Sequence, residues 1–276
     1  AITRMWHELS EHFSRYGDGG VITMAIAGLE LALWDLKGKT LEVPVVELLG
    51  GPVHEALPAY ASLPPLRETE RVLAEISRAA AHGFRAAKLH EHSLRVITEV
   101  ANGAPTDMSL MLDVNGHYDP VEAVGVAQAL AALGYIWFEE PIHPMRDHRA
   151  IGRVAAASPV PLAGGENEYS LRDFEALLRH TGITFLQPEI TKIGGLSAAT
   201  RVSALAELHN VALCPHNFRL GPSLLASIHW GFSSPATRWL EVPWLPEGIE
   251  FSSGVKVPPL EDGKVMAPTG MGFELT

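Results

Sequence analysis

Leu-Met-Leu-Asp, at residues 110–113, is a short apolar run closed by a carboxylate, and the chain repeats this pattern twice more. Glu139 closes a second run 26 residues after Asp113, and Glu166 follows a third run after another 27 residues. One strand–helix–strand repeat has this spacing, so the three side chains are expected at the C-terminal ends of neighbouring parallel strands. Three converging carboxylates stay ionised together only around a cation, and an all-oxygen set suits a hard ion such as Mg²⁺. The sequence therefore predicts that Asp113, Glu139 and Glu166 bind Mg²⁺.

The same spacing continues on both sides of these three runs. Further strand-like runs lie at 57–61, 85–90, 185–189, 211–216 and 238–241, and helical patterns lie at 66–82, 120–133, 170–180 and 196–209. Eight strands alternating with helices predict an α/β fold of the (β/α)₈ barrel type over residues 56–249. Polar residues at the strand C-termini are then the candidate site. The 23 residues from His90 to Asp113 leave little room for a helix and its loops.

Both ends of the chain are expected to lie outside the barrel. Residues 1–55 begin inside an amphipathic helical pattern, continue with an apolar helix from about Thr23 to Lys37, and end with a short helix near residues 44–49. At the other end, residues 255–259 and 264–268 read as a hairpin around a Glu-Asp-Gly turn. Residues 1–55 and 250–276 are therefore predicted to form a partial α+β capping domain.

Composition excludes several classes of partner. The net charge of −11 and the absence of a basic run argue against nucleic acid. No apolar run is long enough to cross a bilayer, and the first residues show no signal-peptide pattern. Cys214 is the single cysteine, which rules out an intramolecular disulfide and fits a cytoplasmic location.

Alternation along the second strand places Lys88 and His90 on one face, toward the predicted metal. By the same alternation Glu140 points away from the side of Glu139, which makes Glu140 the less favoured ligand. His90 and His92 also have the H-x-H spacing of some zinc barrel hydrolases. Such sites usually carry that motif on the first strand, so the carboxylate site is the preferred interpretation.

Five stretches, in order along the chain, resemble the enolase superfamily. They are the helical run 24–39, Leu-Leu-Gly-Gly at 48–51, Phe-Glu-Glu-Pro at 138–141, Gly-Gly-Glu-Asn at 164–167 and Lys-Ile-Gly-Gly at 192–195. Pro-His-Asn at 215–217 is similar to the mandelate racemase subgroup, which includes many acid-sugar dehydratases. Members normally carry a further N-terminal part of the cap, so this chain is expected to be a fragment or to miss its beginning.

The resemblance implies an activity. Superfamily enzymes remove the proton from the carbon beside a carboxylate, with Mg²⁺ stabilising the enolate that forms. It implies that Asp113, Glu139 and Glu166 are the metal ligands and that Lys88 neutralises the substrate carboxylate. His90 stands where the family has a second lysine, and the sequence leaves open whether it is an acid–base group or only binds a substrate hydroxyl.

The resemblance also implies roles on the opposite side of the site. His216 matches the catalytic histidine of the seventh strand, and Glu189 matches its carboxylate partner, which is usually Asp. Glu241 matches a residue that donates a hydrogen bond to the substrate carboxylate. The remaining candidates, expected to bind the substrate through their side-chain amides, are Asn115, Asn167 and Asn217.

The most favoured function is Mg²⁺-dependent dehydration of a sugar acid to a 2-keto-3-deoxy acid. A racemase or epimerase and a lactone cycloisomerase share its first step, and the sequence does not separate the three. A barrel that only binds a metal and a carboxylate is the alternative from another class. Lys88, His90, His216 and Glu241 favour an enzyme, because metal binding alone needs none of them. The resemblance further implies a homo-oligomer.

Overall fold

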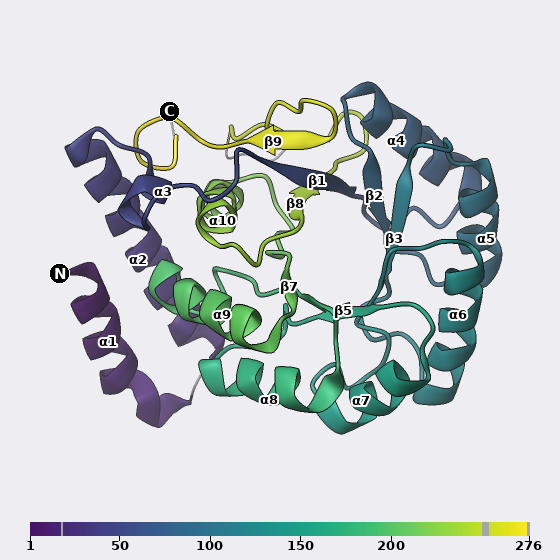
Figure 1. Cartoon of the computed structure of the whole chain (residues 1–276), viewed down its shortest axis with the longest axis horizontal. Coiled ribbons are helices and arrows are strands. Elements are labelled where there is room, and N and C mark those ends of the chain that lie inside the picture. The colour runs from purple at the N-terminus through teal and green to yellow at the C-terminus, as the bar shows by residue number, and fades with distance from the viewer. Residues whose placement is uncertain (18, 250–253, 275–276) are drawn as a thin grey trace.

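A curled parallel sheet of eight strands lies at the centre of the computed structural model, which describes residues 1–17, 19–249 and 254–274 (Figure 1). The strands follow the order β7-β6-β5-β4-β3-β2-β1-β8, and each neighbouring pair is parallel. Leu213 at the end of β7 also forms a bridge with Thr237, which precedes β8. The strands are β1 (Ala56–Ser62), β2 (Ala86–Leu89), β3 (Ser109–Asp113), β4 (Phe138–Glu139), β5 (Leu162–Gly164), β6 (Phe185–Leu186), β7 (Ala212–Leu213) and β8 (Leu240–Pro243).

Helices alternate with these strands and cover the outer side of the sheet (Figure 1). The helix α5 occupies ten of the residues between His90 and Asp113, so the interval that looked too short for a helix accommodates one. The helices are α4 (Thr69–Ala81), α5 (Leu94–Gly103), α6 (Pro120–Ala132), α7 (His148–Ala157), α8 (Leu171–Thr181), α9 (Leu196–His209) and α10 (Pro222–Ser233).

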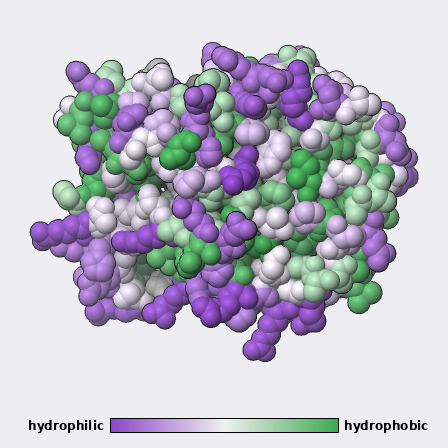
Figure 2. Space-filling model, viewed as in Figure 1, coloured by the Kyte–Doolittle hydropathy of each residue, from purple (hydrophilic) through white to green (hydrophobic). Residues whose placement is uncertain are grey.

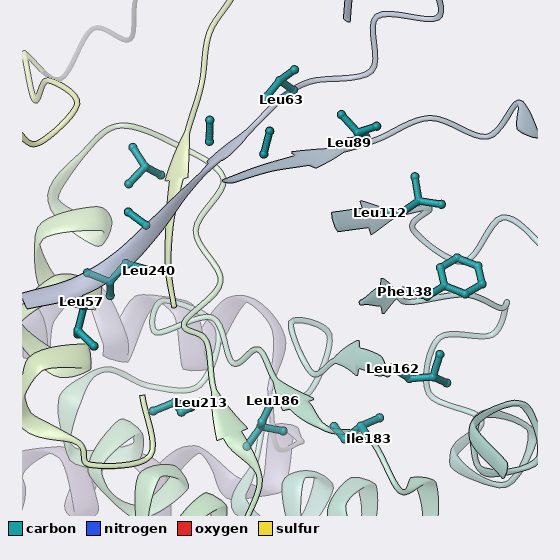
Figure 3. Close-up of a cluster of buried hydrophobic side chains, with 14 of the residues drawn as sticks. Leu57, Leu63, Leu89, Leu112, Phe138, Leu162, Ile183, Leu186, Leu213 and Leu240 are labelled. Carbon is teal, nitrogen blue, oxygen red and sulfur yellow. The ribbon is translucent and has the colours of Figure 1, made fainter. Parts of the chain in front are cut away.

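Strand alternation divides the core into two clusters. Outward residues such as Leu89, Leu112 and Phe138 pack in the large cluster beneath the helices (Figure 3). Inward residues form a smaller cluster inside the curl of the sheet, consisting of Tyr60, Ala86, Met111, Trp137, Ala163 and Cys214. Two residues further along, Lys88, Asp113 and Glu139 share this inward face because strand side chains have a period of two. Buried aromatic and aliphatic side chains thus support the layer of charged side chains at the strand ends.

Three N-terminal helices, α1 (Ile2–Phe13), α2 (Gly20–Leu41) and α3 (Val45–Leu48), precede the sheet, with the 3₁₀ helix Ser14–Tyr16 between the first two. Glu30 of α2 is fully buried and accepts hydrogen bonds from the backbone N–H groups of Leu196 (2.8 Å) and Ser197 (2.9 Å) at the start of α9. A carboxylate at a helix N-terminus satisfies free donors and complements the helix dipole. Glu30 therefore anchors α2 to the segment that follows β6.

No helix in the described part of the chain combines the length and apolar character needed to span a bilayer.

The C-terminal segment differs from the expected hairpin. Strand β9 (Lys264–Met266) pairs antiparallel with β1, and residues 255–259 form no strand. Pro258 and Pro259 have no N–H to donate to a ladder, which explains why this stretch does not pair. Within the predicted 250–276 part of the cap, residues 250–253 and 275–276 lie outside the described residues.

His229 on α10 provides a test of folding that is separate from the site. Its Nδ1 accepts a hydrogen bond from the N–H of Val46 (3.1 Å), and burial lowers its pKa to about 4 although Asp35 opposes this. The unfolded chain binds the proton near the ordinary pKa of about 6.5. The contribution of neutral His229 to the free energy of unfolding is therefore fully present above that pH. It falls as the pH drops toward 4, with about 2.5 kcal/mol lost by pH 4.5.

Replacing His229 by asparagine keeps an acceptor near the Val46 N–H but removes the titrating group. Urea unfolding at pH 7 and pH 4.5 is expected to show a smaller acid loss for His229→Asn than for the wild type, by about 2.5 kcal/mol. Equal losses in the two proteins would show that His229 is not held neutral by the fold.

Candidate active site

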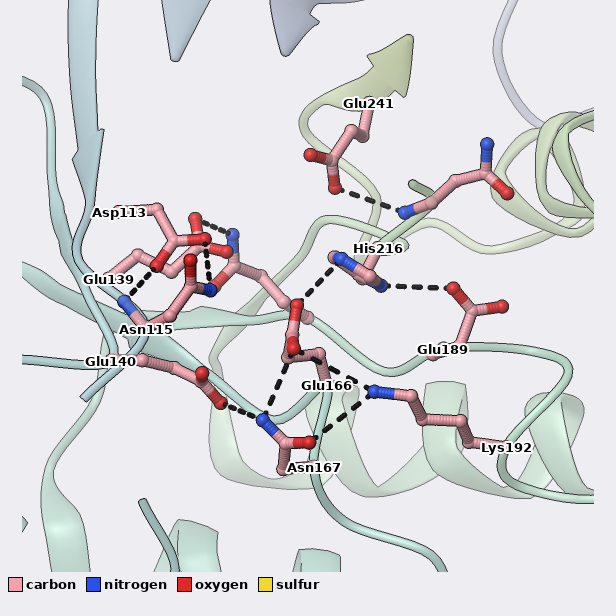
Figure 4. Close-up of polar contacts among 12 residues, drawn as sticks. Asp113, Asn115, Glu139, Glu140, Glu166, Asn167, Glu189, Lys192, His216 and Glu241 are labelled. Carbon is pink, nitrogen blue, oxygen red and sulfur yellow. Dashed lines mark hydrogen bonds and ion pairs between the residues drawn. The ribbon is translucent and has the colours of Figure 1, made fainter. Parts of the chain in front are cut away.

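Three carboxylates meet at the C-terminal ends of β3, β4 and β5 (Figure 4). Asp113 ends β3 and pairs in register with Glu139, which ends β4, while Glu166 lies two residues after β5. One oxygen from each lies within 4.8 Å of the other two. Asp113 and Glu139 are buried, and Glu166 is largely so. The three residues predicted as ligands are thus placed where one ion could contact them all.

Lys88 supplies the positive charge beneath these carboxylates. Its fully buried Nζ lies 2.8 Å from Glu139 Oε1, 2.8 Å from Glu241 Oε1 and 3.7 Å from Asp113 Oδ2. Burial opposes its charge, yet Glu139 and Glu241 raise the pKa of Lys88 well above its usual value. Lys88 is therefore a permanent cation that links β2 to β3, β4 and β8.

Glu139 is fully buried and accepts hydrogen bonds at both of its carboxylate oxygens. Its Oε2 accepts hydrogen bonds from Trp137 Nε1 (3.0 Å) and Gln187 Nε2 (2.6 Å). Burial raises its pKa to about 8, against the lowering effect of Lys88, and the charges of Asp113 and Glu241 add to the rise. A cation added to this group favours the ionised carboxylate.

His216, which follows β7, faces the carboxylates with one nitrogen and Glu189 with the other. Its Nδ1 lies 2.9 Å from Glu189 Oε2, and its Nε2 lies 2.6 Å from Glu166 Oε2. Thr191 donates to the second oxygen of Glu189 through its N–H (3.1 Å) and hydroxyl (2.7 Å). Glu189 is thereby fixed and in turn orients the imidazole, even though it is one methylene longer than the usual Asp.

The charges of His216 and Glu166 stabilise each other. Burial disfavours both charges, but Glu166 holds the pKa of His216 well above its usual range, and His216 holds the pKa of Glu166 at about 2. The pair is therefore an imidazolium–carboxylate ion pair, with Nε2 directed at the proposed ion site.

His90 lies on the other side of the carboxylates. Its Nε2 is 3.1 Å from Asp113 Oδ2, and its Nδ1 contacts the carbonyl oxygen of Leu63. Burial opposes its charge, while Asp113 raises the pKa of His90. His92 does not join it, because its ring stacks on His117 with 3.9 Å between centroids. The H-x-H stretch therefore does not converge on one ion, and the metal-ligand cluster found among the described residues contains carboxylates alone.

The three asparagines occupy different environments. Asn115 donates to Asp113 through its N–H (2.8 Å) and Nδ2 (3.1 Å), and Asn167 Nδ2 donates to Glu166 Oε1 (3.2 Å). Asn217 Nδ2 donates to the carbonyl of Arg219 (2.7 Å), and its Oδ1 accepts from a serine hydroxyl, so its amide is engaged inside the protein. Direct contact of these amides with a substrate stays a prediction.

Glu241, at β8, joins the site as an ionised group. Its Oε2 accepts a hydrogen bond from the N–H of Asn217 (3.0 Å), and its Oε1 pairs with Lys88. Burial favours the neutral acid, but Lys88 lowers the pKa of Glu241 below its usual value. Its hydrogen bond to a substrate carboxylate stays a prediction.

Sequence reasoning missed several residues of the site. The expectation that Glu140 points away is wrong, because Glu140 has a positive φ of 42°, which ends the strand alternation, and its Oε1 accepts from Asn167 (2.8 Å). Lys192 was seen only as part of a motif, yet its Nζ lies 3.7 Å from Glu166 and 3.4 Å from Asn167 Oδ1. Apart from its position directly after β6, nothing in the sequence marked Gln187 as a residue of the site.

A cavity of about 180 Å³ opens beside the charged groups. Its polar lining includes His90, His216 and Glu241, and apolar side chains such as Phe218 and Trp244 form the remainder. A cavity lined by two histidines, a carboxylate and apolar side chains suits a small organic ligand.

Two family models match the chain. The description "Enolase C-terminal domain-like" matches residues 71–276, and "Mandelate racemase / muconate lactonizing enzyme, N-terminal domain" matches residues 2–50. The chain belongs to the enolase superfamily. Within the superfamily the chain is mandelate racemase/muconate lactonizing enzyme-like, in agreement with the resemblance noted at residues 215–217.

Named relatives and a solved structure agree with this enolase-superfamily assignment. D-galactarolactone cycloisomerase of Agrobacterium fabrum is 34% identical over 236 residues, covering 82% of this chain and 62% of the relative. D-galactonate dehydratase of Pectobacterium atrosepticum is 33% identical over 232 residues, covering 79% of this chain and 60% of the relative. The chain thus spans about three fifths of their length. A racemase from Streptomyces coelicolor A3(2) with bound magnesium matches with a TM-score of 0.86 and 28% identity, over 100% of this chain and 78% of that one.

Proposed function

We propose that this site removes the proton beside the carboxylate of a sugar acid and then releases the β-hydroxyl as water, giving a 2-keto-3-deoxy acid. The observation that carries the proposal is the Glu189–His216 dyad. Glu189 holds one ring nitrogen of His216, and the other, Nε2, faces the carboxylate cluster and lies 2.6 Å from Glu166 Oε2. Metal binding alone requires neither the dyad nor His90. The dehydratase relatives add support from the sequence.

Asp113, Glu139 and Glu166 fit a magnesium ion. Their donor atoms are all oxygens, and one oxygen from each lies within 4.8 Å of the other two. When bound, Mg²⁺ would supply Lewis acidity that withdraws charge from the substrate carboxylate. The residues therefore support Mg²⁺ as the cofactor.

The protein groups divide the remaining work. Lys88 provides fixed positive charge near the substrate carboxylate, and Glu241 holds Lys88 in place. We assign proton removal at the α-carbon to His216 Nε2, which must be neutral when it acts, and Glu189 orients its ring. His90, opposite His216, is assigned the role of the acid: it donates a proton to the β-hydroxyl, which then leaves as water. The enol that remains becomes the 2-keto product by protonation at the third carbon.

Lactone cycloisomerisation is the second candidate, because the cycloisomerase relative is 34% identical to the chain. It begins with the same proton removal but expels a ring oxygen instead of a free hydroxyl. Racemisation or epimerisation would return the proton from the opposite side, through His90 or Lys88. A barrel that only binds a metal and a carboxylate would leave the His216 dyad without a purpose.

We propose further that residues 56–249 form a complete (β/α)₈ barrel and that residues 1–55 and 250–276 form a partial capping domain. The family model for the N-terminal domain supports this division, and the Leu213–Thr237 bridge supports closure of the barrel between β7 and β8.

A homo-oligomer is also proposed. Hydrophobic residues lie among hydrophilic ones over the visible face of the molecule (Figure 2), and Val21, Leu29 and Leu36 of α2 are 83%, 48% and 59% exposed. Light scattering at micromolar concentration tests whether the chain forms an oligomer. We also propose a cytoplasmic location.

A screen of sugar acids tests the proposed reaction. The protein is incubated with Mg²⁺ and a panel of aldonic acids, aldaric acids and their lactones, including D-galactonate and galactarate, and formation of a 2-keto acid is followed. We expect turnover of at least one acid in the wild type and none in Glu166→Gln, because the change removes one of the three metal-binding carboxylates. Ring opening or closure without a 2-keto product would select the cycloisomerase. Binding of Mg²⁺ without any turnover would select the non-catalytic alternative.

A further inference from the structure

Glu140 lies in an unusual position directly after β4. Its backbone has a φ of 42°, in the left-handed region, which disfavours a side chain such as glutamate and persists where the surroundings impose it. The turn brings the side chain, only 6% exposed, to the group around Glu166, where Asn167 Nδ2 donates both to Glu140 Oε1 (2.8 Å) and to Glu166 Oε1 (3.2 Å) (Figure 4).

The second oxygen of this carboxylate has no partner. Glu140 Oε2 is buried and accepts no hydrogen bond from any group of the described chain. The carboxylates of Glu166 and Asp113 are close enough to act on Glu140 as neighbouring charges. An unsatisfied carboxylate oxygen beside two like charges is costly, so a cationic ligand at this site would relieve the conflict.

We propose that Glu140 is a fourth carboxylate of the cation centre, with Oε2 accepting a hydrogen bond from the water shell of the bound ion. This inference rests on the proposed metal site of Asp113, Glu139 and Glu166. Glu140 is not part of the group whose oxygens lie within 4.8 Å of one another, which places it outside the set of direct ligands. Mg²⁺ keeps several waters when proteins bind it, and these waters need acceptors.

Substitution of Glu140 by glutamine separates this role from packing. Glutamine has nearly the same shape and keeps an oxygen that can accept from Asn167, but its amide nitrogen replaces the free Oε2 and cannot accept a hydrogen bond. Calorimetric titration with Mg²⁺, without substrate, is expected to show a Kd about 10–100-fold higher for Glu140→Gln than for the wild type. Thermal unfolding without Mg²⁺ is expected to show no loss of Tm, because the change removes a like charge.

Glu30→Gln serves as the matched control, since Glu30 is an equally buried carboxylate that holds α9 rather than the site. Its Mg²⁺ affinity should equal that of the wild type even if its Tm falls. A Kd for Glu140→Gln within about threefold of the wild type would overturn the proposal. Absence of Mg²⁺ binding to the wild type would overturn the metal centre and this inference together, whereas normal Mg²⁺ binding without sugar-acid turnover would overturn the proposed reaction alone.

Discussion

Replacing His216 by asparagine is expected to lower kcat by about 10²–10⁴, the usual contribution of a general base. The reason is positional, because His216 Nε2 faces the carboxylate cluster while Glu189 holds Nδ1 at 2.9 Å. Asparagine cannot accept the α-proton, yet the three carboxylates proposed to bind the metal remain, so Mg²⁺ affinity should be retained. Turnover is measured on the sugar acid selected by the screen, and Mg²⁺ binding by calorimetry.

Isotope exchange distinguishes the two histidines. Loss of His216 should abolish exchange of the substrate α-hydrogen with D₂O if His216 is the base, whereas exchange should persist if His90 is the base. Glu189→Gln, the companion variant, should show a milder loss because the imidazole is present but poorly oriented. Near-full activity of His216→Asn would rule out the dyad and leave the chemistry to the second strand.

Replacing Lys88 by methionine is expected to lower the free energy of unfolding by about 3–5 kcal/mol. Lys88 is fully buried and pairs at 2.8 Å with both Glu139 and Glu241, which are also buried, so its removal leaves two buried carboxyl groups without their cationic partner. Added Mg²⁺ should recover part of the loss by replacing positive charge near Glu139. Urea unfolding at pH 7, with and without Mg²⁺, measures both effects.

Lys192→Met is the matched control for this change. Lys192 is partly exposed, and its closest carboxylate contact is Glu166 at 3.7 Å, so its loss should cost about 1 kcal/mol or less. If Lys88→Met were no less stable than Lys192→Met, the buried ion pairs of Lys88 would not hold β2, β4 and β8 together as the structure indicates.

The sequence was most informative where residue spacing alone places side chains. The 26-residue interval between Asp113 and Glu139 equals one repeat, and the structure pairs these residues in register on adjacent strands. Alternation put Lys88 and His90 on a common face, and both lie against Asp113, at 3.7 Å and 3.1 Å. Period and repeat length are local properties of the chain, so they can be read without the fold.

The features that were missed depend on the fold. The positive φ of Glu140 has no signature in a Phe-Glu-Glu-Pro stretch, although the following proline disfavours a helical conformation there. Lys192 reaches Asn167 and Glu166 across 25 and 26 residues of sequence. The pairing of β9 with β1 joins segments more than 200 residues apart, and no local pattern specifies that register.

Release of deuterium from the α-carbon tests the central claim most directly. A sugar acid deuterated beside its carboxylate is incubated with the wild type and with Glu166→Gln, with Mg²⁺ or with a chelator, and deuterium in the solvent is followed by NMR. We predict release by the wild type only when Mg²⁺ is present, and none by Glu166→Gln. Release that persists without Mg²⁺ or in Glu166→Gln would contradict metal-dependent proton removal at this site.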